Sequence, residues 1–324
     1  MSMKETKKLV TMYDMHPKVA DLKAEVLSGL KASYKSLPPK LFYDKKGSEL
    51  FDDITRLPEY YPTRTEISIL KSCGDEMVQC MGERCMLIEF GSGSSTKVRL
   101  LLDRMQDIAA YMPVDISKVH LYESAEALAD AYPGLPVLAV CTDYTQPFEL
   151  PFYEGAGKEV IFFPGSTIGN FEPEEAELFL ARSAAMLRRG DGLLIGVDLR
   201  KSPEILEAAY NDSQGVTAAF NLNVLERINR DLGANFDVTA FEHHAFYNES
   251  AGRIEMHLRS LRDQDVSVAG EIIHFQKGES IHTENSYKYT VEGFQKMARL
   301  SGYIPIQTWI DPLQFFSIHY LEVR

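Results

Sequence analysis

Short apolar runs alternate with stretches of helical periodicity through the middle of the chain. Five such runs predict strands, near residues 85–90, 110–115, 136–141, 159–163 and 192–197. A helix is expected at 173–188, where Pro173 suits the first turn and Gly190 follows the last. Strands and helices in alternation predict an α/β fold, with a mostly parallel sheet covered by helices on both faces.

The pattern changes on both sides of this block. Before it, apolar spacing predicts helices at about 17–33, 48–57 and 63–82, and residues 1–15 are expected to be a polar, flexible tail. After it come helical residues at about 201–240, strand-like alternation at about 239–288, a helix ending at Gly302, and strands near 303–310 and 315–323. Alternation with a period of two is typical of antiparallel strands. We therefore expect the last two strands to form an antiparallel hairpin that completes the sheet.

The segment at 201–288 is too long for a loop and interrupts the parallel pattern, which indicates an inserted domain. We predict that residues 16–64 and 201–288 form one discontinuous α+β domain that binds the substrate. Residues 65–200 and 289–324 then form the domain that contains the parallel sheet.

The stretch 88–96, IEFGSGSST, joins the first of the five strands to a helix. Glycines at this point let the chain turn sharply and let a ligand approach the backbone, as in nucleotide pockets. Thr96 stands where the dinucleotide fingerprint has its third glycine, so the motif alone fits an ordinary tight turn equally well. The candidate cofactor-binding residues of this stretch are Gly91, Gly93, Ser94 and Lys97.

Acidic residues follow the next two strands. Asp115 lies 24 positions after Gly91, close to where an acid meets ribose hydroxyls in nucleotide-binding folds. Asp143 follows the third strand, where an acid can accept a hydrogen bond from an adenine amino group. Glycine, acid and acid at three successive strand ends resemble a class I S-adenosylmethionine-dependent methyltransferase more than a dehydrogenase.

Composition narrows the substrate class. The chain has 324 residues and a net charge of −13, which argues against nucleic acid and against an anionic membrane surface. We see no signal peptide, no apolar run of membrane-spanning length and no Cys-x-x-Cys pair. These features predict a cytoplasmic enzyme with reduced cysteines, no metal site and a small soluble substrate.

Two loops are candidates for binding. Tyr60 and Tyr61 lie between prolines, where they either present aromatic rings to a ligand or fasten the N-terminal helices to the rest of the protein. The loop at 164–171 follows the fourth strand and contains Asn170, which either binds a ligand or was selected for backbone tolerance. We favour binding for this loop, because ligands of open α/β sheets lie beyond the carboxyl ends of the strands.

Long strings in one order carry a family resemblance over nearly the whole chain. They are SLPPKLFYD, GSELFDDITRLPEYYPTRTE, IEFGSGSSTK, FFPGSTIGNF, AYNDSQGVTAAFN, RIEMHLRS and HTENSYKY. With them the chain resembles the histidine Nα-methyltransferases of ergothioneine biosynthesis. The resemblance implies a class I methyltransferase fold and S-adenosylmethionine-dependent trimethylation of the α-amino group of L-histidine to hercynine. We also expect a monomer.

The resemblance also implies roles for individual residues. Gly91 and Asp115 would line the cofactor, with Asp143 and Tyr144 near the adenine. Asn170 and Tyr210 match residues that hold the substrate carboxylate, and Glu284 and Ser286 match residues that hold the imidazole. The residues that would line the amino-acid pocket are Tyr43, Phe51, Tyr60 and Met256. Tyr60 or water would relay the amine proton. Pro164, in the loop after the fourth strand, departs from the family pattern, in which we expect a less rigid residue at that position.

Other readings remain open. The His282-x-Glu284 pair lacks the Pro-Cys-x-x-Cys partner of zinc deaminases, and His243 and His244 would face opposite sides of a strand, so neither pair predicts a metal site. His257 is read as an ordinary strand residue. The alternatives are an N-methyltransferase of another amino acid such as a prenylated tryptophan, a non-catalytic S-adenosylmethionine-binding regulator and, third, a dehydrogenase.

Overall fold

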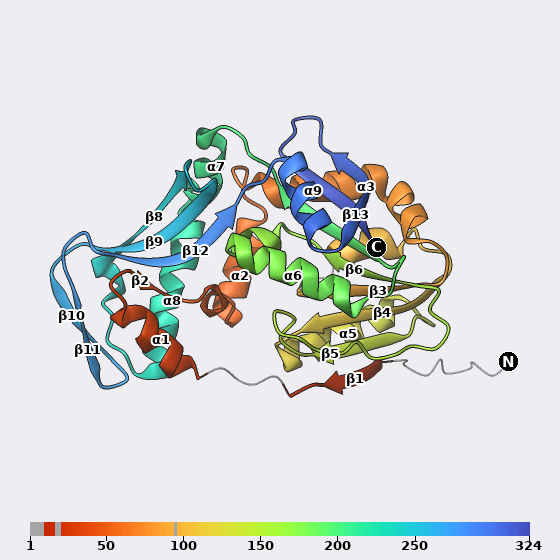
Figure 1. Ribbon diagram of the computed structural model, residues 1–324. Helices are drawn as coiled ribbons and strands as arrows, with labels where there is room; N and C mark the ends of the chain where they lie inside the picture. The colour runs from red at the N-terminus through yellow and green to blue at the C-terminus, as the bar shows by residue number, and fades with distance from the viewer. Residues whose placement is uncertain (1–9, 17–20, 94–95) are drawn as a thin grey trace.

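The computed structural model describes residues 10–16, 21–93 and 96–324, and an eight-stranded sheet forms its larger part (Figure 1). The strand order is β1-β5-β4-β3-β6-β7-β14-β13, and β14 alone runs antiparallel to the other strands of this sheet, pairing with β7 on one side and β13 on the other. The strands are β1 (Val10–Asp14), β3 (Cys85–Phe90), β4 (Ile108–Asp115), β5 (Val137–Cys141), β6 (Lys158–Phe163), β7 (Gly192–Asp198), β13 (Tyr303–Ile310) and β14 (Phe316–Val323). The five predicted parallel strands and the final hairpin are therefore confirmed.

Helices cover both faces of this sheet because its central strands are apolar on both sides. All six residues of β3 are buried, as expected for a parallel strand between two helical layers. One apolar core joins the sheet to α3 (Tyr61–Met81), α4 (Thr96–Leu102) and α5 (Lys118–Ala131). A second core, on the other face, joins it to α6 (Pro173–Met186) and α9 (Val291–Leu300).

The strand β1 corrects the prediction of a flexible tail for part of the N-terminus. Its residues pair in parallel with β5, from Val10 opposite Val137 to Asp14 opposite Cys141. The strand is short, lies at the edge of the sheet and is only partly buried, so its sequence carries weak apolar alternation. The remaining residues predicted as tail, apart from 15, lie outside the described part of the chain.

A smaller sheet, of order β2-β12-β9-β8, lies beside the first (Figure 1). Its strands are β2 (Lys35–Ser36), β8 (Phe241–Asn248), β9 (Arg253–Ser260) and β12 (Ser280–Tyr287). The hairpin β10 (Gln264–Val268) and β11 (Glu271–Phe275) extends from it. The predicted antiparallel block is thus confirmed, and β2 adds a short parallel strand from the N-terminal region.

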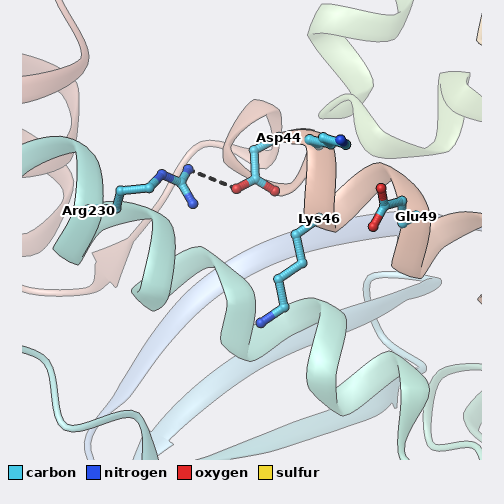
Figure 2. A pocket seen from close by; sticks show the side chains of 5 residues that line it. Asp44, Lys46, Glu49 and Arg230 are labelled. Atoms are coloured by element: carbon cyan, nitrogen blue, oxygen red, sulfur yellow. Dashed lines mark hydrogen bonds and ion pairs between the residues drawn. The ribbon is translucent and has the colours of Figure 1, made fainter.

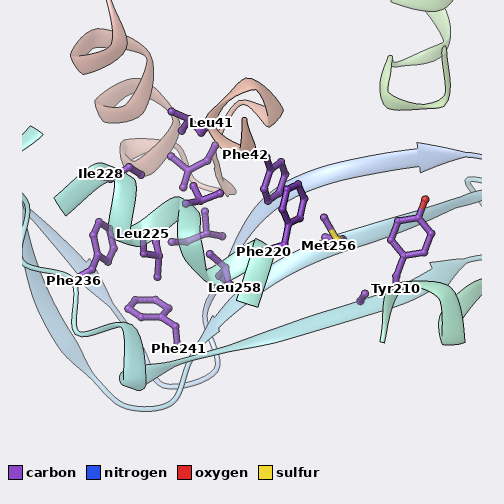
Figure 3. Close-up of a cluster of buried hydrophobic side chains, with 14 of the residues drawn as sticks. Leu41, Phe42, Tyr210, Phe220, Leu225, Ile228, Phe236, Phe241, Met256 and Leu258 are labelled. Carbon is purple, nitrogen blue, oxygen red and sulfur yellow. The ribbon is translucent and has the colours of Figure 1, made fainter. Parts of the chain in front are cut away.

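Helices from both parts of the chain cover one face of the smaller sheet. They are α1 (Leu22–Lys31), the 3-10 helix η1 (Pro39–Phe42), α2 (Lys45–Ile54), α7 (Pro203–Tyr210) and α8 (Val216–Leu232). Phe220 and Leu225 of α8 pack between η1 and strand residues such as Met256 and Leu258 (Figure 3). This shared core explains why residues far apart in sequence build one unit. The domain boundaries proposed after residues 64, 200 and 288 stay a prediction.

The region predicted as helical at 201–240 is divided. Asp212 breaks it, because its carboxylate accepts hydrogen bonds from the Val216 and Thr217 amides at 2.9 and 2.8 Å and so begins α8. Gly215 precedes that helix with φ of 72°, a conformation that favours glycine. Among the helices that the structure describes, none is long and apolar enough to cross a membrane.

Candidate active site

The glycine turn lies at the carboxyl end of β3. Gly91 has φ of +73°, and its amide donates to the Val114 carbonyl at 2.9 Å. A Cβ built at Gly91 would lie 3.6 Å from the Tyr144 hydroxyl. A Cβ built at Gly93 would meet no atom of the described residues within 4 Å. The backbone of this turn is therefore open to a ligand on the Gly93 side and faces Tyr144 on the other.

The acids predicted to hold the cofactor lie at the neighbouring strand ends. Asp115 is the last residue of β4 and accepts from the Ser117 amide at 2.8 Å, while burial raises its pKa. Asp143 follows β5 and accepts from the Thr145 amide at 2.9 Å. Tyr144 stacks on Phe90 with ring centroids 5.4 Å apart, which leaves its hydroxyl at the glycine turn. The arrangement fits a nucleoside along one edge of the sheet.

Buried polar atoms at this edge support the same fit. The Ser92 side chain is 1% exposed, and within the described residues its Oγ has no hydrogen-bond partner. Such an atom is costly unless a ligand satisfies it, and S-adenosylmethionine carries amino, carboxylate and hydroxyl groups that can do so. The predicted cofactor residue Ser94 lies outside the described residues.

Lys97 is held by a buried acid that the sequence did not single out. Its Nζ lies 2.6 Å from Glu66 Oε2, and the other oxygen, Oε1, accepts from the Gly165 amide at 2.9 Å. A Cβ at Gly196 would lie 2.2 Å from Glu66 Oε1, so the small residue in β7 makes room for the carboxylate. Glu66 thus links the start of α4, which carries the cofactor candidate Lys97, to the loop after β6.

Glu89 is a second buried acid beside the turn. It is 3% exposed and accepts a hydrogen bond from the Tyr111 hydroxyl at 2.5 Å. Burial raises the pKa of Glu89 to about 7, although Tyr111 and Lys97 act in the opposite direction. Charging this group in the folded protein is therefore unfavourable.

We expect Glu89→Gln to stabilise the cofactor-free protein by about 1–3 kcal/mol at pH 8. The folded pKa of about 7 lies above the ordinary value of 4.5, so wild-type stability falls as pH rises through that interval. Glutamine keeps an acceptor for Tyr111 but cannot charge, so the gain should vanish near pH 4. Urea unfolding at pH 4, 6 and 8 measures the difference in the free energy of unfolding between this variant and the wild type. The variant Glu83→Gln, at an exposed position, is the control. A gain independent of pH would contradict the assignment.

The predicted substrate residues meet in two hydrogen-bonded pairs. Asn170, at the end of the 3-10 helix η2 (Thr167–Asn170), donates from Nδ2 to Glu284 Oε1 at 2.9 Å. The Tyr210 hydroxyl, from the end of α7, donates to Ser286 Oγ at 2.8 Å. Each pair therefore joins a candidate for the substrate carboxylate to a candidate for the imidazole. The Asn170–Glu284 pair thus joins the loop after β6 of the larger sheet to β12 of the smaller one.

Local structure explains how the side chains of Glu284 and Ser286 come to lie on the same face of β12. Both lie in β12, two positions apart, so their side chains point the same way. Glu284 stands opposite Met256 of β9, whose side chain belongs to the apolar core. Burial raises the pKa of Glu284 to about 7, while Lys288 and the Asn170 hydrogen bond lower it. Near neutral pH this carboxyl group can therefore change its charge when a ligand binds.

Aromatic rings form the wall next to these pairs. Tyr60 lies 6.3 Å from both Tyr210 and Phe51, and Phe51 lies 5.9 Å from Tyr43, measured between ring centroids. The aromatic residues predicted to contact the substrate are thus in one connected group. Phe220 belongs to it as well, 6.0 Å from Phe51, and was missed although it lies in the string AYNDSQGVTAAFN.

A buried ionic network behind the pairs was also missed. Lys288 Nζ donates to Ser286 Oγ at 2.7 Å and to the Tyr210 hydroxyl at 3.2 Å, and it lies 2.8 Å from Asp198 Oδ2. Lys201 and the Tyr61 hydroxyl also bond Asp198. Burial alone would raise the pKa of Asp198, but the two lysines hold it below its usual value. A cation therefore stands directly behind Tyr210 and Ser286.

A pocket on the surface lies apart from this site (Figure 2). Two of its charged residues make structural contacts: Arg230 pairs with Asp44 at 2.8 Å, and Asp44 caps α2 by accepting from the Gly47 amide at 2.7 Å. Asn223 of α8 also donates to Asp44. These contacts fasten α2 to α8 and give the pocket a structural explanation.

The sheet order, the glycine turn and the acids at the strand ends define a class I S-adenosylmethionine-dependent methyltransferase. The chain matches, over residues 22–323, the family described as histidine-specific, SAM-dependent methyltransferases, and it belongs to that family. It is 44% identical to a histidine N-alpha-methyltransferase of Mycolicibacterium smegmatis, over 94% of this chain and 95% of the relative. For the Mycobacterium tuberculosis protein of the same name the identity is 42%, over 92% and 93%.

A fungal relative is larger. The chain is 32% identical to ergothioneine biosynthesis protein 1 of Neurospora crassa, over 89% of this chain but only 34% of that protein. About a third of the fungal protein thus corresponds to most of this chain.

Proposed function

We propose that this protein transfers three methyl groups, one after another, from S-adenosylmethionine to the α-amino nitrogen of L-histidine, giving hercynine for ergothioneine biosynthesis. One observation carries the proposal: the buried Glu284 carboxyl group lies on the same pocket as Asn170, Tyr210 and Ser286. These groups can form hydrogen bonds with both the carboxylate and the imidazole of histidine. The family membership and the named relatives support the same substrate.

Positioning supplies most of the catalysis in this proposal. When bound, S-adenosylmethionine supplies an electrophilic methyl group, and Gly91, Asp115 and Asp143 would hold it at the strand ends. Asn170 and Tyr210 would hold the substrate carboxylate, and Glu284 and Ser286 the imidazole. The amine is then left free to approach the methyl donor in line, without a metal or a covalent intermediate.

The amine must lose a proton before each transfer. Burial raises the pKa of Tyr60 well above its usual value, and Tyr210 and Glu284 raise it further. Tyr60 therefore keeps its own proton at neutral pH, and it can relay the amine proton only by releasing its own in the same step. Water needs no such exchange, so we assign Tyr60 mainly to shaping the pocket. The surrounding rings would also favour the growing positive charge by cation–π contact.

Mass spectrometry of histidine incubated with the protein and S-adenosylmethionine tests the proposal. We expect mono-, di- and trimethylhistidine in succession, all modified on the α-nitrogen. Methylation of a ring nitrogen would show that histidine binds in the reverse orientation. Cofactor binding without product from any amino acid would instead favour the non-catalytic regulator, and a product only from tryptophan derivatives would favour the other methyltransferase.

Asn170→Ala should raise the histidine KM about ten-fold and leave S-adenosylmethionine binding unchanged, because the amide would contact the substrate carboxylate. Histamine, which lacks that carboxylate, should be a very poor substrate for the wild type. Initial rates and calorimetric titration of the cofactor measure both effects. Asn235→Ala is the control, since Asn235 contacts only the β10 strand through Ser267 in the described contacts. Loss of cofactor binding with an unchanged histidine KM would reverse the assignment.

A further inference from the structure

The outer face of the smaller sheet carries a cluster of metal-ligand side chains. Glu255 and His257 of β9 and His282 of β12 each place one ligand atom within 4.8 Å of the others. Glu255 Oε2 and His257 Nε2 are 3.1 Å apart, and His257 stands directly opposite His282 in the strand register. The cluster lies away from the active site, because Met256 and Leu258, next to these residues in β9, belong to the core on the opposite face.

Neighbouring residues hold the carboxylate in a fixed orientation. Glu255 Oε1 accepts from Asn248 Nδ2 at 2.9 Å and from Arg253 Nε at 2.8 Å. These bonds hold Oε1 and leave Oε2 facing His257. Supporting hydrogen bonds of this kind are typical around metal-binding carboxylates.

The protonation of His282 follows from its neighbours. Asn285 donates from Nδ2 to Glu172 Oε1 at 2.7 Å, so its carbonyl oxygen is the atom that faces His282 Nε2 at 2.8 Å. His282 Nε2 must therefore carry a hydrogen, and Nδ1 has the free lone pair. A histidine that donates from one ring nitrogen and offers the other is the arrangement found at metal sites.

We propose that Glu255, His257 and His282 bind one divalent transition-metal ion of the zinc class. Two imidazoles and one carboxylate suit zinc, and water can supply the fourth position. Ligand atoms around a tetrahedral zinc lie about 3.3 Å apart, given bonds of about 2.0–2.1 Å. The Glu255–His257 pair already has this spacing, and the ligand atom of His282 lies within 4.8 Å of both. Binding replaces the His257 Nε2–H···Oε2 hydrogen bond, with the proton moving to Nδ1 of the same ring.

The ion would join β9 to β12 two residues before Glu284. The strand register shifts between His282 and Glu284, so β12 is irregular where it enters the substrate pocket. A metal on the outer face would fix this irregular point. The sequence prediction of no metal site considered His282 with Glu284 and His243 with His244, whereas the fold groups His282 with residues of another strand.

Zinc titration of the tag-free protein against a chromophoric chelator tests the proposal. We expect one zinc ion per chain in the wild type and at least ten-fold weaker binding in His257→Gln and in His282→Gln. His274→Gln is the matched control, since this exposed histidine has a single carboxylate neighbour, Asp265, and should bind zinc as the wild type does. Zinc should also raise the wild-type Tm, but not that of the double variant His257→Gln/His282→Gln.

Melting in EDTA establishes that the variants are folded, so a loss of zinc affinity can be read as a loss of ligands. Wild-type affinity in the double variant would overturn the proposal, because the zinc would then sit elsewhere, for example on cysteine. Absence of zinc binding by the wild type even at a large molar excess of zinc would overturn it too. Neither result bears on the proposed methyltransferase activity, which uses the opposite face of the sheet.

Discussion

Glu284→Ala is expected to lower histidine affinity about ten- to a hundred-fold, which corresponds to roughly 1.5–3 kcal/mol for a hydrogen bond to a charged group. At pH 8 most Glu284 is ionised, because its pKa is about 7, and its carboxylate can accept from an imidazole N–H. The same substitution removes an acceptor that a larger apolar ring would leave unpaired. The ratio of kcat/KM for histidine to that for tryptophan should therefore fall, and more so if Met256 is also shortened.

Glu284→Gln separates the charge from the shape. Glutamine keeps an oxygen that can accept from Asn170 but removes the charge, so histidine affinity should lie between wild type and Glu284→Ala. The wild type should also show a change in kcat/KM near pH 7 that Glu284→Gln lacks. If the histidine-to-tryptophan ratio does not move in Glu284→Ala, Glu284 does not bind the imidazole.

Lys288→Met should destabilise the protein by roughly 3 kcal/mol, because it leaves Asp198 buried with one of its two lysine partners missing. The histidine KM should also rise, since Tyr210 and Ser286 lose the donor behind them. The S-adenosylmethionine Kd should stay unchanged. Urea unfolding, initial rates and cofactor titration together measure the three quantities.

Lys296→Met is the control for Lys288→Met. It removes an exposed lysine of α9 and changes the net charge by the same amount. An equal loss of stability in both variants would show that the charge, rather than the network, matters. An unchanged histidine KM in a folded Lys288→Met protein would show that the network is purely structural. Lys288 is therefore a positioning residue in this proposal and contacts the substrate only through Tyr210 and Ser286.

Strand prediction succeeded where burial leaves a plain pattern. The apolar runs of β3 and β7 are buried along their whole length, and the sequence predicts both to within one residue. The helix α3 begins at Tyr61 rather than near residue 63, because Pro62 is accepted in a first helical turn. Edge elements such as β1 and β2 escaped prediction, since they are short and partly exposed, and the pairing that makes them strands comes from distant residues.

The pocket could be anticipated only in part. Family strings carried Asn170, Tyr210, Glu284 and Ser286, and the fold brings them together. The pairing of Asn170 with Glu284 joins positions 114 residues apart, which no local pattern indicates. A buried charged residue such as Lys288 would be predicted from the sequence to lie on the surface, because lysine is usually exposed. Its role emerges only from the three-dimensional contacts with Asp198.

The edge strand β1 affects how the protein can be handled. Its backbone satisfies the outer hydrogen-bonding edge of β5, and Met15 extends the pairing by donating to the Cys141 carbonyl at 3.0 Å. A truncation that begins at residue 16 would uncover that edge, whose residues Val137 to Cys141 are apolar. Uncovered apolar edges recruit strands from other molecules and promote aggregation. Expression of the catalytic unit should therefore retain residues 10–15.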